Sequence, residues 1–237
     1  MSQESLTLRQ AAQLVHLDEN ELRHAAQRGE VPAQEHGGDW HFLRRDLDEW
    51  AQRDLLAASP REQLRRHEAI RAARQRTHAG DARVADLFRP GSITLALGAK
   101  AKAGVVRDMA DLAARTGLVY DPEALYRELK EREDVASTAV GEGAAFLHPR
   151  FHDPYLFEES FICYGRSLQP VFFGAADGEP THHFFLVCAT DDAQHLRILS
   201  RLAVMAHATE FLSLLDEAED EARVEAVIRA AEEGLLK

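Results

Sequence analysis

A short basic segment divides this chain into two acidic parts. Residues 1–59 carry six arginines against eleven acidic side chains, whereas residues 60–80 carry six arginines against two glutamates. Residues 81–237 return to an acidic balance, with sixteen basic and twenty-seven acidic side chains. A chain of 237 residues is long enough for two domains. We therefore predict an N-terminal domain over residues 1–58, a basic helical linker over 59–80 and a C-terminal domain over 81–237.

The overall composition argues against several classes of protein. A formal net charge of −12 disfavours general coating of nucleic acids. No apolar run approaches 18 residues, and the polar N-terminus lacks the core of a secretory signal, so we expect a cytoplasmic protein without membrane insertion. The two cysteines, Cys163 and Cys188, lie in apolar stretches and are predicted to be buried free thiols. Because the sequence has neither a zinc-ligand spacing nor a Gly-Lys-Ser nucleotide loop, we predict no metal and no cofactor.

Turn and cap residues divide residues 6–53 into a regular series of elements. Thr7 and Asp18 are suited to cap two successive helices, and Gly29 is suited to end the second helix in a left-handed conformation. Gly37-Gly38 indicates a hairpin turn between two short strands, in which Trp40 and Phe42 are expected to point inward. A closing helix follows the hairpin. The predicted order is helix, turn, helix, hairpin, helix.

This order of elements resembles the excisionase and MerR-type winged helix-turn-helix family. The resemblance implies that the second helix enters the major groove of duplex DNA. The candidate DNA contacts lie on the second helix and on the basic linker: Arg23, His24, Arg28, Arg61, Arg65 and Arg66. The second helix is nearly neutral and the hairpin carries Glu35 and Asp39, which repel phosphate. Docking to a protein therefore stays open as the alternative role of this module.

The C-terminal part alternates between helical and strand patterns. After a brief leader, helices are predicted from Lys102 to Gly117 and from Pro122 onward, and two further helices close the chain. Between these pairs lie four apolar runs that predict strands, namely AAFLH, SFICYGR, THHFFLVCA and a separate strand with its turn in PVFFGAADGEP. Alternation along the third run places one of His182 and His183 inside and the other outside. We expect an α/β domain with a mixed sheet flanked by helices.

One stretch of the C-terminal part, EREDVASTAVGEGAAFLHPR, resembles the phosphorylation-site region of the type-2 enzyme IIA domains. This family of the sugar phosphotransferase system has fructose, mannitol and nitrogen-regulatory members. Its pattern is Arg-Glu, then Ser-Thr, then a glycine-rich turn that leads to a histidine. The matching residues here are Arg132-Glu133, Ser137-Thr138, Gly141, Gly143, Ala145 and His148, and DDAQHLRILSRLA brings His195 at the start of a helix. The resemblance covers about residues 86–236, with Ala139, Leu147 and Pro149 as departures from the pattern.

The resemblance implies that His148 is the phosphoacceptor and that His195 and Arg132 assist it. Neutral imidazole can accept a phosphoryl group through its lone pair, and transfer depends mainly on positioning and charge stabilisation. Ser137, Thr138, Gly141 and Gly143 are expected to form a phosphoryl-binding loop whose amides point at the phosphoryl oxygens. Arg132 and His195 are expected near the surface of the site.

Together these features predict a bacterial regulatory protein in which a histidine-phosphorylatable enzyme IIA domain is coupled to a DNA-binding module. Its chemistry would be at most that of a phosphocarrier. The implied phosphoryl donor is the histidine phosphocarrier protein or its nitrogen-branch counterpart, and a regulated protein target is a further candidate partner. Phosphorylation is expected to draw the linker arginines toward the C-terminal domain. The alternative is a non-catalytic interaction protein that keeps the enzyme IIA fold and docks through the winged module.

Overall fold

A computed structural model describes residues 5–75, 83–150, 156–208 and 210–235. The chain forms two compact units, Met1–Gly80 and Asp81–Lys237, which we describe separately. In the described ranges, no helix is both long and apolar enough to span a membrane, and no group of three or more His, Cys, Asp or Glu side chains is arranged to hold a metal ion. Cys163 and Cys188 are buried free thiols, which confirms the prediction.

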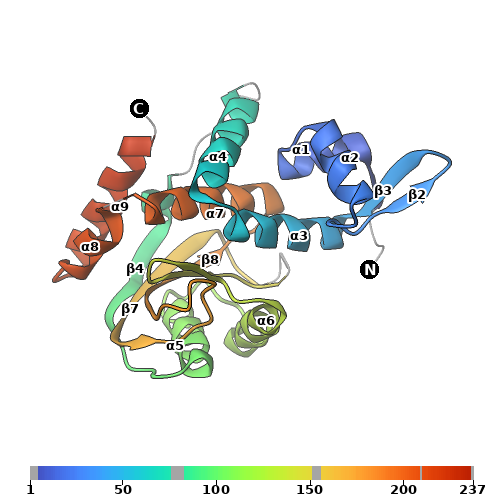
Figure 1. Ribbon diagram of the computed structural model, residues 1–237. Coiled ribbons are helices and arrows are strands. Elements are labelled where there is room, and N and C mark those ends of the chain that lie inside the picture. Colours follow the sequence, from blue (N-terminus) through green and yellow to red (C-terminus); the bar gives the residue numbers. More distant parts are fainter. Residues whose placement is uncertain (1–4, 76–82, 151–155, 209, 236–237) are drawn as a thin grey trace. The chain divides into compact units, whose positions relative to one another are not determined.

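The first unit contains a three-stranded antiparallel sheet and four helices among its described residues (Figure 1). In chain order these are β1 (Ser5–Thr7), α1 (Leu8–Val15), α2 (Glu19–Gln27), β2 (Gln34–His36), β3 (Asp39–Leu43), α3 (Arg44–Ala57) and α4 (Pro60–Gln75). The strand order is β1-β3-β2. The first strand was not expected from the sequence, because three residues ahead of a cap residue are too short to show an alternating pattern.

The local signals of the first unit act as predicted. The Thr7 side chain accepts from the backbone N–H of Gln10, whose own side chain accepts from the Thr7 N–H, so α1 begins with a capping box. Asp18 caps α2, and Gly29 follows that helix at a φ of +71°. Phe42 is fully buried, whereas Trp40 is only half-buried and differs in this from the expectation.

The helix α4 packs against the first unit rather than standing in solvent. Gln63, His67 and Ile70 are buried along one face, and the Gln63 amide donates to the carbonyl of Leu55 on α3 over 3.2 Å. The sequence suggested a largely solvated linker because the apolar stripe is thin. The buried face is instead completed by the polar side chains of Gln63 and His67, which hydrophobic periodicity does not count.

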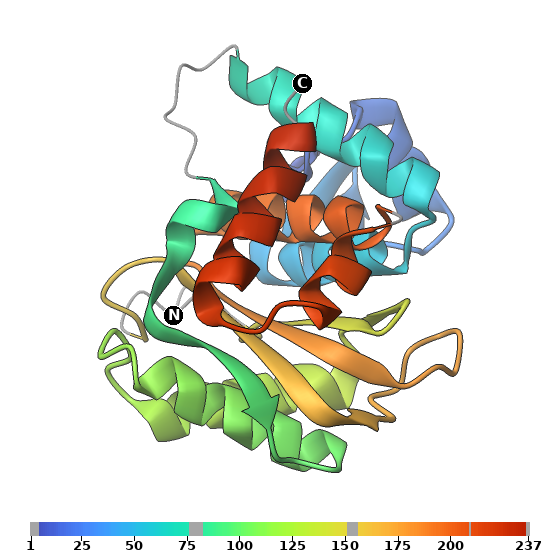
Figure 2. The ribbon, with the colours of Figure 1, turned by 90° about the vertical axis from the view of Figure 1, so that its left-hand side faces the viewer.

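The second unit is a five-stranded mixed sheet with helices on both faces (Figure 2). In chain order its elements are η1 (Val84–Leu87), β4 (Phe88–Leu97), α5 (Lys102–Ala114), α6 (Pro122–Val135), β5 (Ala139–Gly141), β6 (Ala144–Leu147), β7 (Phe161–Val171), β8 (Thr181–Cys188), α7 (Asp192–Ala206), α8 (Phe211–Asp216) and α9 (Glu221–Leu235). The strand order is β4-β7-β8-β6-β5, in which β4 with β7 and β6 with β8 are parallel pairs. Helices α5 and α6 cover one face, and α7 and α9 lie over the other.

This architecture confirms the predicted α/β fold but differs from the prediction in several of its elements. The supposed leader contains the edge strand β4, whose pattern is interrupted by Pro90 and by Gly91 at a φ of +79°. Pro170 and Val171 form the end of β7 and not a separate strand. The short helix α8 was not predicted, since six residues show too little periodicity.

A polar network that is buried at Tyr164 and His183 and exposed at Asp216 connects α8 to the sheet. The Tyr164 hydroxyl lies 2.8 Å from Nδ1 of His183, and Nε2 of His183 lies 3.3 Å from the Asp216 carboxylate. Arg166 donates to the Leu215 and Asp216 carbonyls at the end of α8. His183 is buried and His182 is half-buried, so the predicted alternation is confirmed. Burial lowers the pKa of His183 from 6.5 to about 4, against the opposing pull of Asp216.

We predict that His183 makes the second unit sensitive to acid. A base whose pKa is lower in the folded state binds fewer protons than in the unfolded state, so its stabilisation is lost as the pH falls below 6.5. The loss should reach about 3 kcal/mol by pH 4. Urea unfolding followed by far-UV circular dichroism should therefore show a flatter pH dependence for His183→Gln than for wild type. His182→Gln is the matched control, and equal pH dependence in all three proteins would contradict the prediction.

Candidate functional site

His148 is held at the end of a central strand. It directly follows β6, which pairs with β8 on one side and β5 on the other. The side chain is 1% exposed, and its Nδ1 lies 2.8 Å from the carbonyl oxygen of Phe146. Since a carbonyl oxygen can only accept, the proton of the neutral ring is on Nδ1 and the lone pair is on Nε2.

Arg132 approaches that lone pair from α6. Its Nε donates to Nε2 of His148 over 2.9 Å, and its Nη1 donates to the Ala136 carbonyl over 2.9 Å. The guanidinium is therefore fixed at two points beside the nitrogen atom that has the free electron pair. A planar cation with several donors is well suited to bind the oxygens of a phosphoryl group at this position.

His195 completes the group from the opposite face of the sheet. It lies in the first turn of α7, whose start is capped by Asp191 through the Gln194 N–H. The His148 and His195 rings meet edge to face, with centroids 4.8 Å apart. The structure thus brings together the three residues expected at the phosphoacceptor site, although they are separated by up to 63 residues in the chain. The start of a helix also favours an added negative charge.

The burial of these side chains differs from the expectation. Arg132 is 1% exposed and His195 is fully buried, so neither lies at the surface of the site. Glycine spacing and helix starts locate a residue along the chain, but they do not show how much protein covers it.

The predicted phosphoryl-binding loop is split between the two ends of β6. Thr138 lies toward the His148 end, since its carbonyl accepts from the Phe146 N–H, and Ser137 precedes it. Gly141 and Gly143 instead flank Glu142 in the turn between β5 and β6, at the opposite end of β6 from His148. All three turn residues have positive φ, so the glycines make the hairpin possible. In this structure they do not surround the histidine, in contrast to the expectation.

Glu133 and Lys102 were missed as parts of this site. The Glu133 carboxylate accepts from the Thr138 hydroxyl over 2.6 Å and from the Thr138 N–H, and it pairs with Nζ of Lys102 at 2.8 Å. The Arg-Glu pair in the motif indicated Glu133 as a matching residue. No signal in the sequence linked it to a lysine 31 residues earlier.

In the first unit, several of the candidate DNA-contacting arginines are bonded within the module. Arg23 donates to Asn20 over 2.6 Å, and Arg28 forms a two-point contact with Glu30 that raises the pKa of Arg28. On α4, two ion pairs also involve candidate residues: Arg65 with Glu21, and Arg66 with Asp54. His24 and Arg61 are exposed.

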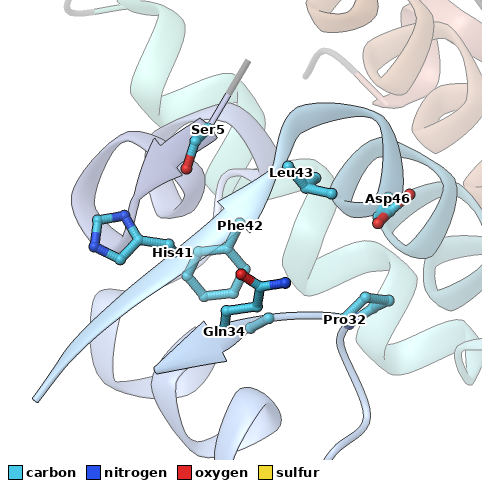
Figure 3. A pocket seen from close by; sticks show the side chains of 8 residues that line it. Ser5, Pro32, Gln34, His41, Phe42, Leu43 and Asp46 are labelled. Atoms are coloured by element: carbon cyan, nitrogen blue, oxygen red, sulfur yellow. The ribbon is translucent and has the colours of Figure 1, made fainter. Parts of the chain in front are cut away.

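The first unit also has a hollow of about 220 Å³ beside the hairpin (Figure 3). It is lined by Ser5, Pro32, Ala33, Gln34, His41, Phe42, Leu43 and Asp46. The lining contains one carboxylate and no arginine or lysine, so it is not suited to bind phosphate. The candidate contacts to duplex DNA therefore remain those on α2 and α4.

Solved structures share the fold of the second unit. A nitrogen regulatory IIA protein from Neisseria meningitidis aligns with a TM-score of 0.56 and 22% identity, covering 61% of this chain and 98% of that one. The mannitol IIA protein from Escherichia coli aligns with a TM-score of 0.53 and 17% identity, covering 60% and 98%. The second unit therefore has the fold of an enzyme IIA domain.

The sequence defines the family more closely. The sequence model of one protein family, described as phosphoenolpyruvate-dependent sugar phosphotransferase system, EIIA 2, matches residues 86–231. The chain belongs to this family. The fructose-specific EIIABC component of Bacillus subtilis is 31% identical over 141 residues, 59% of this chain, which spans about a fifth (22%) of that protein. A nitrogen regulatory protein of Bradyrhizobium diazoefficiens is 30% identical over 148 residues, covering 61% of this chain and 94% of that one.

A second model, described as a helix-turn-helix domain, matches residues 5–54. This range contains α1, α2, the hairpin and most of α3. The N-terminal unit is therefore a helix-turn-helix domain, as expected. Its closer likeness to excisionase proteins stays a prediction.

We predict that Arg132→Ala destabilises the second unit, because the arginine is buried. The change removes the donor to His148 Nε2 and to the Ala136 carbonyl and leaves a cavity, which together should cost about 3 kcal/mol. Urea unfolding followed by far-UV circular dichroism measures this loss. Tryptophan fluorescence provides an internal control, since Trp40 and Trp50 are the only tryptophans and both lie in the first unit. Arg127→Ala, an exposed change on the same helix, should be neutral. Equal stability of the two variants would contradict the buried role.

Proposed function

We propose that the C-terminal domain accepts a phosphoryl group on Nε2 of His148, and that the helix-turn-helix domain passes this state to a target in a bacterial regulatory system. The observation that carries the proposal is the pair of hydrogen bonds on the His148 ring. Phe146 holds the proton on Nδ1, and Arg132 marks Nε2 as the nitrogen with the lone pair. The ring is thus fixed in the protonation state that a nucleophile requires.

The transfer step follows from this arrangement. The donor is a phosphohistidine protein, and the family resemblance favours the histidine phosphocarrier protein or its nitrogen-branch counterpart. The lone pair of His148 Nε2 forms the new bond to phosphorus while the phosphorus–nitrogen bond of the donor breaks. The electron pair of the broken bond returns to the donor imidazole. The Nδ1 proton of His148 stays in its hydrogen bond to Phe146.

Arg132 and His195 then stabilise the product. As the new bond forms, the guanidinium moves from Nε2 to the phosphoryl oxygens, which carry most of the charge in a loose transition state. His195 is in position to donate to the same group from the start of α7, where the helix dipole favours an anion. Neither role requires a metal ion or a nucleotide.

The burial of the site favours a second candidate function. With His148, Arg132 and His195 at most 1% exposed, the site must open before a donor can reach Nε2. A protein that keeps this closed form would be a non-catalytic interaction protein with an enzyme IIA fold. In that case the helix-turn-helix domain would serve in protein docking.

Intact mass after incubation with phosphorylated histidine phosphocarrier protein, or with its nitrogen-branch counterpart, distinguishes the two candidates. We predict that the full chain gains one phosphate and that His148→Ala gains none. His182→Ala, a half-buried histidine on β8, is the matched control and should gain phosphate as the wild type does. If neither donor phosphorylates the wild-type chain, the non-catalytic function is favoured. Phosphate gain by His148→Ala would assign the acceptor to another residue.

We further propose that duplex DNA is the target of the helix-turn-helix domain. The exposed face of α2 carries His24, Arg28 follows as the C-cap residue of that helix, and α4 adds Arg61. The ion pairs of Arg65 and Arg66 reduce the number of linker arginines that can contact phosphate, so binding rests on fewer cations than the linker composition suggests. The acidic groups of the hairpin oppose binding, and weak affinity is expected.

Salt dependence tests the DNA proposal. If Arg61 contacts a phosphate, Arg61→Gln should make the plot of log affinity against log salt less steep. The magnitude of its negative slope should fall by about 0.9, because one fewer counterion is released. Binding of the full chain to duplex DNA at several salt concentrations gives this slope. Arg127→Gln in the second unit is the control and should leave the slope unchanged. An unchanged slope for Arg61→Gln would remove α4 from the interface, and no binding at low salt would favour protein docking.

A further inference from the structure

The buried carboxylate of Glu133 organises the segment that leads into β5. Its side chain is 4% exposed, and it accepts from both the N–H and the hydroxyl of Thr138. The neighbouring Arg132 binds the Ala136 carbonyl, so both residues of the Arg-Glu pair hold the stretch from Ala136 to Thr138. A buried carboxylate is costly unless its charge is balanced.

Lys102 provides that balance from an unusual position. It is the first residue of α5, where the helix dipole disfavours a cation, and the helix start has neither an acidic residue in its first turn nor a side-chain cap. Its Nζ lies 2.8 Å from the Glu133 carboxylate and 5.2 Å from the centre of the Phe173 ring. The pairing with Glu133 offsets the unfavourable interaction with the dipole.

A continuous set of hydrogen bonds leads from this pair to the phosphoacceptor. The Thr138 carbonyl accepts from the Phe146 N–H over 3.0 Å, and the Phe146 carbonyl accepts from Nδ1 of His148. Both sides of the Arg132–His148 contact therefore depend on the segment that Glu133 holds. A shift of Thr138 would move Phe146 and the His148 ring relative to the guanidinium.

We propose that Lys102 is a positioning residue for phosphoryl transfer, acting through Glu133 on the alignment of His148 with Arg132. The predicted effect of Lys102 on transfer rests on the proposed function. The predicted effect of Lys102 on the His148 ring can be measured without a phosphoryl donor. Lys102 is about one-third exposed, so its head group can be changed without opening a core cavity. It therefore allows the alignment of the site to be tested separately from its packing.

The test compares Lys102→Met, which keeps the side-chain length but removes the charge, with Lys102→Arg and with Lys100→Met at an exposed neighbouring position. Transfer from phosphorylated histidine phosphocarrier protein is measured at saturating donor, together with the donor concentration that gives half the maximal rate. We expect Lys102→Met to lower the maximal rate by about tenfold or more, because small misplacements of reacting groups are costly. The half-saturating concentration should not change. Lys102→Arg should recover most of the rate, and Lys100→Met should match the wild type.

Nitrogen-15 NMR of the His148 ring, recorded without donor, provides the independent measurement. The wild type should show the neutral form with the proton on Nδ1, and Lys102→Met should shift toward a mixture of tautomers. If the two residues act together, Glu133→Gln combined with Lys102→Met should lose no more rate than the larger single effect. The proposal would be overturned if Lys102→Met kept the ring signals and the maximal rate of the wild type. It would also be overturned if the substitution changed only the half-saturating donor concentration. Failure of every protein to accept phosphate would instead contradict the proposed function, and the NMR comparison would still decide the role of Lys102.

Discussion

The hydrogen bond from Arg132 to His148 has two effects on the His148 ring. It fixes the tautomer of the ring together with Phe146, and it also occupies the lone pair that would attack phosphorus. The resting site is therefore aligned but closed. In the proposed transfer, the guanidinium would exchange one acceptor, the ring nitrogen, for another, the phosphoryl oxygens. Since a charged acceptor binds arginine more strongly than a neutral one, this exchange would favour the phosphorylated state in the proposed reaction.

The rest of the domain supplies the stiffness that this contact needs. The pairing of β6 with β8 fixes the backbone up to Leu147, and α7 brings His195 against the ring from one face of the sheet. On the other face, α6 carries the adjacent residues Arg132 and Glu133, which have different roles. Arg132 contacts Nε2 of His148, whereas Glu133 holds the segment on which that contact depends. A buried polar network of this kind specifies one arrangement, because any shift leaves a buried group without its partner.

The sequence was informative where the signal is local. Caps at Thr7 and Asp18 and the hairpin glycines placed the elements of the first unit, and the motif around His148 brought its arginine and second histidine together. It was less informative where the outcome depends on pairing across the sheet. Gly141 and Gly143 are only a few residues from His148, yet the extended strand β6 runs between them and His148 and leaves them at its opposite end. The Lys102–Glu133 pair and the burial of the site depend on packing between distant segments, which motif spacing does not encode.

The basic segment shows how charge composition and charge placement differ. Its six arginines suggested a cationic linker between two acidic bodies, and α4 instead packs on the helix-turn-helix domain. Arg65 pairs with Glu21, which lies on α2, the helix expected to face DNA. The pair is exposed and contributes little to stability, but it offsets a carboxylate that would repel phosphate. Arg65 thus reduces the repulsion that an anion would meet at α2, because it offsets the charge of Glu21.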